Sequence, residues 1–333
     1  MPDSGLDELD LQIIHALQVE PRVPWTALAP ILGGDPATLA RRWARIERGG
    51  FAWLTTLPGL LDERASAIVE FGCEPGRTVE TAAHLSVDPT VYSIDITSGR
   101  RDLVATVVTD DDDALAEAVI ERFGGIPGVR SVQSHIVNVS VRVGSSWTVR
   151  ALTDEQVGRI PARRPPRASS AKRVDPVITE GMRRVLERDG RASHDTIAKR
   201  LGISAQRAGD YLARLRQTER LLIRTDVSDP YSTWPIVSWF FVQAPSSTIE
   251  ANSALLATMP EVQFAAITTG PFNLVLAVSA RSRAEIVHRE ADLERRLPGA
   301  RIVDRSMVLR VHKHLGRMIS PSGFATGESV PLG

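Results

Sequence analysis

The sequence is poor in cysteine and aromatic residues, carries no net charge and contains no long apolar run. Cys73 is the one cysteine among 333 residues, so no disulfide can form within the chain. Lysine and arginine number 40, as do aspartate and glutamate, so the overall charge favours no class of partner. No stretch approaches ~18 consecutive apolar residues, and the acidic N-terminus MPDSGLDELD does not resemble a signal peptide. We therefore expect a soluble cytoplasmic protein with no membrane partner, in which Cys73 is a small buried hydrophobe.

The sequence does contain an internal repeat. Residues 6–59 and 175–228 align without a gap at an offset of 169. Residues 96–108 (ITSGRRDLVATVV) align with residues 267–279 (ITTGPFNLVLAVS) at an offset of 171. The chain is therefore a two-part unit written twice.

The first part of each copy has the pattern of a helix-turn-helix domain. Apolar residues recur at helical spacing from Leu6 to Leu17, and a second short helix ends at Gly33 and Gly34. Asp35 is placed to cap a third helix. Three short helices with a glycine turn between the second and third are typical of helix-turn-helix domains.

The second part of each copy is predicted to alternate strands and helices. In the first copy, β-branched residues dominate 67–72, 90–97, 103–109 and 132–143, with helical patterns at 79–85 and 115–123. In the second copy, the same order of elements occupies residues 239–311. The order βαββαβ is that of a ferredoxin-like domain. The sequence predicts an α+β fold with two copies of a winged-helix-type helix-turn-helix domain followed by a ferredoxin-like domain.

Composition indicates where these domains meet. We expect the two helix-turn-helix domains at 1–60 and 174–230, the two ferredoxin-like domains at 61–147 and 231–317, a linker at 148–173 and a flexible tail at 318–333. The later part of the linker, GRIPARRPPRASSAKR (158–173), is rich in arginine and proline without any acid, which predicts an extended segment. The alternatives for its arginines are a merely solvated tether or contacts with a phosphate backbone.

The third helix of each helix-turn-helix domain carries the candidate DNA-binding residues. In the first copy, the side chains predicted to point away from the core are Thr38, Arg41, Arg42 and Arg45. In the second copy they are Ser204, Gln206, Arg207 and Arg214, together with Asp210, whose carboxylate would repel phosphate. Arginine can pair with guanine in the major groove or with phosphate, so double-stranded DNA is the expected partner. The alternative for both helices is a solvated face whose arginines add solubility.

Charge also separates the domains. Residues 65–145 contain twelve acidic and six basic residues, with four consecutive aspartates at 110–113. The first ferredoxin-like domain is therefore not a nucleic-acid surface.

Several motifs resemble those of the leucine-responsive regulator and asparagine-operon regulator (Lrp/AsnC) family. They are LDELDLQIIHALQ at the start, LAPILGGDPATLARRWARIERGGF after it, and the loops TSGRRD and TTGPFN. The resemblance implies a transcriptional regulator whose dimers pair their effector-domain sheets and assemble into larger rings. It also implies that small effectors, often amino acids, bind between effector domains.

The same resemblance points to effector-binding residues in the two loops. The family's Gly-x-x-Asp element is matched by Gly99 and Asp102, whereas the second copy has Gly270 and Asn273. The intervening candidates are Arg100, Arg101 and Phe272. Glycine lets a ligand approach the backbone and a carboxylate can accept an ammonium group, so we expect tighter binding at the first loop. The alternative is a plain turn between strands.

An enzyme is the second functional hypothesis. Siroheme decarboxylases resemble the same two-part fold, and their chemistry would need histidines around a large pocket. His135, His312 and His314 are the candidates for that role, but the histidines of the chain are scattered. No catalytic, metal-binding or cofactor motif is present, so we expect no enzyme activity, cofactor or metal.

Self-association is expected because two predicted strands are long. An unpaired edge along 132–143 or 300–311 would promote aggregation. Pairing of sheets into a dimer or tetramer would remove it. The sequence leaves open whether effector domains pair within one chain or between chains.

Overall fold

The computed structural model describes residues 5–59, 63–143, 147–163, 174–228 and 234–333. The chain divides into two compact units, one formed by Met1–Leu61 and Thr148–Val227 and the other by Asp62–Trp147 and Ser228–Gly333. Both helix-turn-helix domains therefore belong to the first unit and both ferredoxin-like domains to the second. We name them head 1 (6–59), head 2 (175–228), sheet domain 1 (63–143) and sheet domain 2 (234–314).

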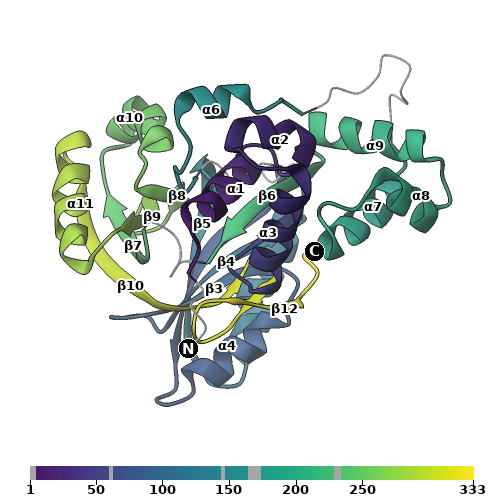
Figure 1. The fold of residues 1–333 in the computed structure, drawn as a ribbon. Coiled ribbons are helices and arrows are strands. Elements are labelled where there is room, and N and C mark those ends of the chain that lie inside the picture. Colours follow the sequence, from purple (N-terminus) through teal and green to yellow (C-terminus); the bar gives the residue numbers. More distant parts are fainter. Residues whose placement is uncertain (1–4, 60–62, 144–146, 164–173, 229–233) are drawn as a thin grey trace. The chain divides into compact units, whose positions relative to one another are not determined.

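Each head contains the three helices that its sequence predicts (Figure 1). In head 1 they are α1 (Glu8–Val19), α2 (Trp25–Leu32) and α3 (Pro36–Arg48), and in head 2 they are α7 (Pro176–Arg188), α8 (His194–Leu201) and α9 (Ala205–Gln217). Gly33 and Gly34 have φ angles of 80° and 89°, which are readily adopted only by glycine, and they make the turn before α3. The carboxylate of Asp35 accepts hydrogen bonds from the main-chain N–H groups of Ala37 and Thr38 and so caps α3.

A strand after the third helix joins the two heads. Strand β1 (Ala52–Pro58) of head 1 pairs in antiparallel register with β6 (Leu221–Val227) of head 2. The Thr55 hydroxyl donates to Asp226 across this pair at 2.5 Å. The strand that a winged helix would fold into its own wing thus pairs with its counterpart in the other copy, and the two heads share one small sheet.

The first part of the predicted linker is folded. Helix α6 (Asp154–Arg159) begins with a capping box between Thr153 and Gln156. Val149 and Leu152 are buried, and the Leu152 N–H donates to Nδ1 of His15 in α1 at 2.8 Å. The first residues of the linker expected over 148–173 are therefore folded against head 1, and α6 reaches into the segment from 158 that was expected to be extended. Residues 164–173, with Arg164, Arg167, Lys172 and Arg173, lie outside the described residues.

Each sheet domain has the predicted βαββαβ order. Sheet domain 1 contains β2 (Ala65–Cys73), α4 (Thr78–Ser86), β3 (Val91–Thr97), β4 (Leu103–Thr109), α5 (Asp112–Glu117) with a π-helical turn at Ala118–Arg122 and a 3-10 turn at Phe123–Gly125, and β5 (Val129–Arg142). Sheet domain 2 contains β7 (Ile236–Gln243), α10 (Ser246–Thr258), β8 (Val262–Thr269), β9 (Leu274–Ala280), α11 (Arg283–Arg296) and β10 (Arg301–His314).

The strands of the two sheet domains close into a barrel. The order along the sheet is β10-β3-β4-β2-β5-β8-β9-β7, and β7 pairs again with β10. The joints between copies are β5 with β8 and β10 with β3, all antiparallel. The long strands that the sequence marked as hazardous edges are thus paired within one chain, which settles the alternative left open above.

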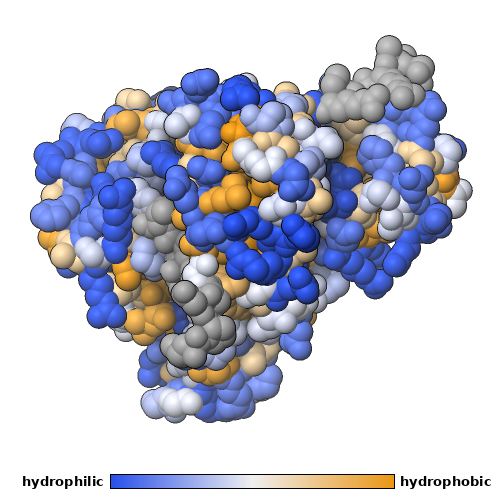
Figure 2. Space-filling view, in the orientation of Figure 1, coloured by the Kyte–Doolittle hydropathy of each residue, from blue (hydrophilic) through white to orange (hydrophobic). Residues whose placement is uncertain are grey.

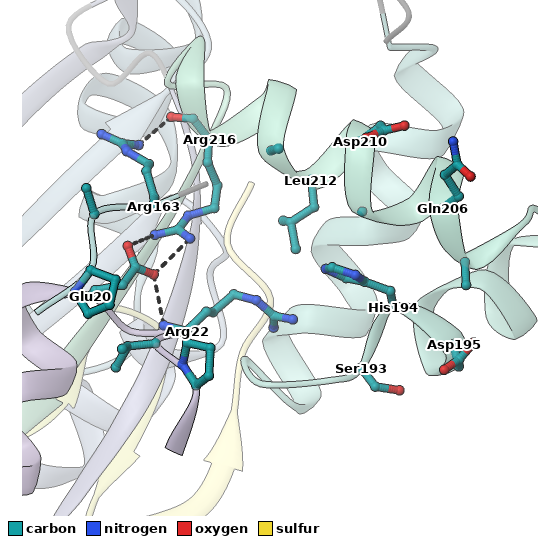
Figure 3. A pocket seen from close by; sticks show the side chains of 17 residues that line it. Glu20, Arg22, Arg163, Ser193, His194, Asp195, Gln206, Asp210, Leu212 and Arg216 are labelled. Carbon is teal, nitrogen blue, oxygen red and sulfur yellow. Dashed lines mark hydrogen bonds and ion pairs between the residues drawn. The ribbon is translucent and has the colours of Figure 1, made fainter. Parts of the chain in front are cut away.

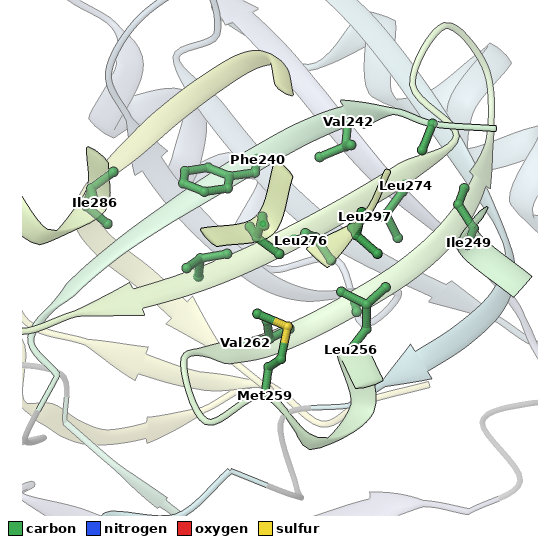
Figure 4. Close-up of a cluster of buried hydrophobic side chains, with 14 of the residues drawn as sticks. Phe240, Val242, Ile249, Leu256, Met259, Val262, Leu274, Leu276, Ile286 and Leu297 are labelled. Atoms are coloured by element: carbon green, nitrogen blue, oxygen red, sulfur yellow. The ribbon is translucent and has the colours of Figure 1, made fainter. Parts of the chain in front are cut away.

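Alternation along the strands separates two kinds of core. One face of sheet domain 2 packs against α10 and α11 through an apolar cluster that includes Phe240, Leu256, Leu276 and Leu297 (Figure 4). Sheet domain 1 has an equivalent cluster beneath its helices. The opposite faces of both sheets contribute to a third cluster of Ile68, Val104, Val237, Trp239, Phe241, Phe272, Val275 and Ala277. This third cluster, formed by both copies, is here called the barrel interior.

The C-terminal segment is ordered, which differs from the flexible tail expected over 318–333. It contains β11 (Arg317–Ile319) and β12 (Ala325–Ser329), which pair with each other. Leu332 is buried, and the main-chain oxygen of Gly333 accepts a hydrogen bond from the Tyr92 hydroxyl at 2.9 Å. Elsewhere, the prediction that Cys73 is buried is confirmed. Within the described ranges, no helix combines the length and apolarity needed to cross a membrane.

Candidate functional site

Thr38 and Arg41 lie on the N-terminal half of α3 and form the first part of the head 1 candidate site. Arg41 is exposed, and its Nη2 donates to the Thr38 hydroxyl at 3.0 Å. That hydroxyl donates to Asp35 Oδ2 at 2.5 Å, so the helix cap, Thr38 and Arg41 form one chain of hydrogen bonds. The surface over α3 is hydrophilic on the face drawn in Figure 2. Thr38 and Arg41 are therefore held where a ligand outside the head can meet them.

The other two arginines of α3 face α1. Arg42 Nη1 lies 2.6 Å from Asp7 Oδ2 and 2.9 Å from Asp10 Oδ1, and Arg45 forms an ion pair with Asp10 Oδ2. The Asp10 side chain is 0% exposed, against 31% for Arg42 and 43% for Arg45. Burial opposes ionisation of Asp7, but hydrogen bonds from Arg42 and the Asp10 N–H outweigh it and hold the Asp7 pKa below its ordinary value.

The sequence prediction for Arg42 and Arg45 therefore needs correction. It placed both on an outward face from helical spacing alone, whereas the structure pairs both with the acids that begin α1. Arg42 is half-buried in these contacts, whereas Arg41 and Arg45 both remain exposed.

The candidates on α9 of head 2 are differently placed. Ser204 caps α9 by accepting from the Arg207 N–H, and Arg207 Nε donates to the Tyr211 hydroxyl at 2.7 Å. Arg214 is half-buried and lies near Gln217 at 3.4 Å. Gln206 lines a pocket with residues of head 1, as does Asp210. Head 2 thus presents fewer exposed arginines than the sequence suggests.

The two predicted effector loops fold as matching turns. The Asp102 carboxylate accepts a hydrogen bond from the Cys73 N–H at 2.7 Å. Asn273 Oδ1 accepts from the Ala244 N–H at 3.0 Å, and its Nδ2 donates to the Ala244 carbonyl at 2.7 Å. Cys73 and Ala244 are equivalent positions in the two copies. The Asp102 carboxylate and the Asn273 amide therefore bind the same end of the first strand of their domains. The glycines hold φ angles of 95° at Gly99 and 141° at Gly270.

The side chains of Arg101 and Phe272 extend from these loops into the barrel interior, where both contact the Phe241 ring. Arg101 is 3% exposed, and its Nε donates to Glu70 Oε2 at 2.7 Å. Its other two nitrogens donate to the Ser306 hydroxyl and to Asp304 Oδ2 at 2.8 and 2.9 Å. The guanidinium carbon lies 3.9 Å from the centre of the Phe241 ring, and Phe272 packs on the same ring at 5.4 Å. Arg100, by contrast, is exposed.

Glu70 and His135 are the site residues that sequence reasoning did not assign to this place. His135 is fully buried, and its Nε2 lies 2.8 Å from Glu70 Oε1. Burial raises the Glu70 pKa, but hydrogen bonds with His135 and Arg101 outweigh that effect and lower it. An acid inside the apolar strand AIVEFG was the available signal, because a buried carboxylate needs a partner.

The barrel interior is chemically unequal between the copies. At the offset of 171, Glu70, Arg101 and His135 of sheet domain 1 correspond to Phe241, Phe272 and Ser306 of sheet domain 2. The rings of His135 and Phe272 are 5.5 Å apart. Arg101 and His135 of sheet domain 1 thus pack against Phe241 and Phe272 of sheet domain 2.

The three histidines considered for enzyme chemistry do not form a cluster. His135 lies on β5, whereas His312 and His314 lie on β10. Burial lowers the His312 pKa, and Arg310 and Lys313 add to that effect. In the part of the chain that the structure describes, no group of three His, Cys, Asp or Glu side chains could hold a metal ion.

Two family models match the first copy. The AsnC-type helix-turn-helix domain matches residues 6–47, and the Lrp/AsnC ligand binding domain matches residues 66–144. These ranges fall on head 1 and sheet domain 1. They contain Thr38 and Arg41 of α3 and the loop from Gly99 to Asp102.

Known proteins resemble either one copy or the whole chain. An uncharacterized HTH-type transcriptional regulator of Pyrococcus furiosus is 28% identical over 136 residues, which are 40% of this chain and 91% of the relative. The HTH-type transcriptional regulator FL11 of Pyrococcus horikoshii is 27% identical over 135 residues, or 40% of this chain and 89% of that protein.

Among solved structures, the siroheme decarboxylase NirDL shares the fold over 93% of both chains, with a TM-score of 0.55 and 14% identity. That likeness shows the fold alone. The family models and the regulators match the sequence itself, and the first copy is similar to an AsnC-type helix-turn-helix domain followed by an Lrp/AsnC ligand binding domain.

Proposed function

We propose that this protein is a transcriptional regulator that binds specific double-stranded DNA through α3 of head 1 and responds to a small-molecule effector. The observation that carries the proposal is the match of residues 6–47 to the AsnC-type helix-turn-helix domain, on which the half-buried Thr38 and the exposed Arg41 lie. The major groove of B-DNA admits one α-helix, and an arginine there can pair with both acceptors of guanine.

The ion pairs of Arg42 and Arg45 support this role indirectly. They fix α3 against α1 through the buried Asp10, so the angle at which the helix meets DNA is set by the head itself. Arg41 is then the residue that reads a base, and Thr38 orients its guanidinium.

Head 2 supplies the second, weaker contact. For Arg207 and Arg214 on α9 we propose phosphate contacts, which add affinity but no sequence preference. Strands β1 and β6 join the heads, so the binding of one head raises the effective concentration of the other at the DNA.

In vitro selection of DNA with the purified full chain tests this proposal, followed by fluorescence anisotropy on the selected site. Arg41→Ala is expected to cost ~1–3 kcal/mol of binding and to relax sequence preference at one position. Arg48→Ala is the matched control, since Arg48 is exposed on the same helix and donates to the Ala44 carbonyl of that helix. Equal losses of specificity in the two variants would contradict the assignment of Arg41.

For the effector, we propose an amino acid or related metabolite at the loop from Gly99 to Asp102. Arg100 is exposed there and can pair with a carboxylate, while the glycine lets a ligand approach the backbone. Asp102 is engaged with the Cys73 N–H, so its contribution is to hold the loop. The weaker binding proposed at the second loop rests on Pro271, which stands where the first loop has Arg100.

A thermal-shift screen of metabolites tests the effector site. A ligand that saturates should raise the melting temperature of the wild type and lose that effect in Arg100→Ala. Arg130→Ala removes another exposed arginine of the same domain and should keep the full response. A ligand that stabilises all three proteins equally would exclude this loop.

We further propose that whole chains associate into a dimer or tetramer. In the family, pairing of sheets joins separate subunits. Here the corresponding pairs, β10 with β3 and β5 with β8, form within one chain, so association of chains must use other surfaces. Light scattering in physiological salt tests this. A single species at 36.3 kDa would refute it.

An enzyme of the siroheme decarboxylase type is the second candidate, because NirDL shares the fold over nearly the whole chain. His135 is committed to Glu70 inside the barrel, which makes it a poor proton donor to a large substrate. Addition of siroheme to the purified protein separates the two functions. The regulator is expected to leave the absorption spectrum of siroheme unchanged, whereas a bound and decarboxylated tetrapyrrole would establish the enzyme.

A further inference from the structure

Two equivalent arginines hold the heads together. Arg22 of head 1 donates to the carbonyls of Gly190 and Ala192 at 2.5 and 2.7 Å. Arg191 of head 2 donates to the carbonyls of Pro21 and Val23, both at 2.6 Å. All three pairs of positions are related by the offset of 169, so the two guanidinium groups are held in the same way.

The faces of these guanidinium groups meet different neighbours. Arg191 lies over the ring of Trp25, with 4.2 Å between the guanidinium carbon and the ring centre. The residue equivalent to Trp25 in head 2 is His194. Its ring lies against Gly209 of α9, where an added Cβ would come within 2.9 Å of Nδ1. The indole that covers one arginine is thus replaced by a smaller ring that packs against α9.

Two more substitutions between the copies reduce volume at the same place. Trp43 of α3 corresponds to Leu212 of α9, and Ala40 corresponds to Gly209. Each difference replaces a larger side chain by a smaller one on the head 2 side.

A pocket lies where this volume is missing. It has a volume of about 930 Å³, and Arg22, Val23, His194, Gly209 and Leu212 are among its lining residues (Figure 3). Arg216 closes one side through its ion pair with Glu20 at 2.9 Å. The pocket is therefore bounded by the α1–α2 loop of head 1, by residues 161–163 and by α8 and α9 of head 2.

We propose that this pocket binds a small planar aromatic molecule, whose ring lies against the Arg22 guanidinium as Trp25 lies against Arg191. The protein itself supplies the template, because the equivalent arginine already holds an indole ring. A guanidinium favours the face of an aromatic ring over a saturated group of similar size. The apolar side chains of Val23 and Leu212 suit the remaining surface of such a ring.

A ligand in this pocket would act on DNA binding through α9. Gln206 and Asp210, on the outward face of α9, also line the pocket, as Figure 3 shows. The bound ring would touch the loop of head 1 and the third helix of head 2 together. The site is separate from the effector loops of the sheet domains and does not depend on them.

The test uses the full-length protein with indole as the probe, followed by saturation-transfer NMR. A matched pair of smaller probes, benzyl alcohol and cyclohexylmethanol, tests the need for an aromatic ring. Indole and benzyl alcohol are expected to bind saturably, and cyclohexylmethanol at least about tenfold more weakly. His194→Trp should fill the pocket and abolish indole binding. Val177→Trp adds an indole at an exposed position of α7 and should leave binding unchanged.

A second readout does not depend on any variant. In the wild-type protein, indole should shift the Arg22 Nε–H resonance through its ring current and leave that of Arg191 in place. Absence of saturable binding, equal binding to His194→Trp, or binding without a shift at Arg22 would each overturn the proposal.

Discussion

Loss of Arg42 and Arg45 together should destabilise head 1, because Asp10 would remain as a buried carboxylate without a cationic partner. Its two oxygens accept from Arg42, from Arg45 and from the Asp7 N–H at 3.2 Å. Breaking a buried ion pair by removing one side costs ~3–5 kcal/mol. The two arginine side chains are 31% and 43% exposed, so solvent screening reduces that figure to about 2–3 kcal/mol for Arg42→Met with Arg45→Met.

The assay is thermal unfolding of the full chain followed by circular dichroism. At ~2–4 °C per kcal/mol for domains of this size, the double variant should unfold about 4–12 °C lower. Adding Asp10→Asn to it should restore most of the loss, since the neutral amide needs no cation. Thr179 stands at the equivalent position in head 2, which shows that a neutral residue fits there.

Arg41→Met serves as the control, because an exposed arginine should change stability by less than ~0.5 kcal/mol. An unchanged melting temperature in the double variant, together with lost DNA specificity, would refute the structural role of the pair. It would return Arg42 and Arg45 to the base-reading role that helical spacing predicts.

Three further outcomes follow from buried charges. Burial, with Arg150 nearby, lowers the His15 pKa from 6.5 to about 4, so the free energy of unfolding should fall as pH drops from 6.5 to 4. His15→Asn keeps an acceptor for the Leu152 N–H and should remove that fall in thermal melts across this range. Burial lowers the Lys313 pKa from 10.5 to about 8, so the free energy of unfolding should rise with pH between 8 and 10.5. In Lys313→Met, thermal melts should show no such rise. Arg101→Met should cost ~3 kcal/mol by leaving Glu70 with His135 alone, and Glu70→Gln added to it should recover most of that loss in denaturant titrations.

The repeat and most elements could be predicted because their signals are local. The strand predicted over 103–109 has those bounds in the structure. The predicted cap Asp35 does begin α3. Period and capping chemistry depend on residues a few positions apart, so a single sequence contains them.

Partners distant in sequence could not be predicted in the same way. Strand β1 was missed because its stability comes from β6, more than one hundred and sixty residues away. The C-terminal strands β11 and β12 were missed because they are short and β12 is largely exposed, and the hydrogen bond between Gly333 and Tyr92 leaves no periodic pattern.

In the candidate site, too, features set by neighbouring residues could be predicted and contacts between distant residues could not. Helical spacing identified the face that contains Arg41, Arg42 and Arg45, but the acids that neutralise two of them belong to another helix. The loops at Gly99 and Gly270 were recognised by their motif, yet their convergence on Phe241 follows from closure of the barrel by both copies.

Selection of DNA by the purified chain from a random library, sequenced after successive rounds at fixed salt, tests the central claim most directly. We expect enrichment of one site, bound at least ~10³-fold more tightly than unselected DNA and weakened by Arg41→Ala. Recovery of no enriched sequence, with the same affinity for selected and unselected DNA, would contradict it.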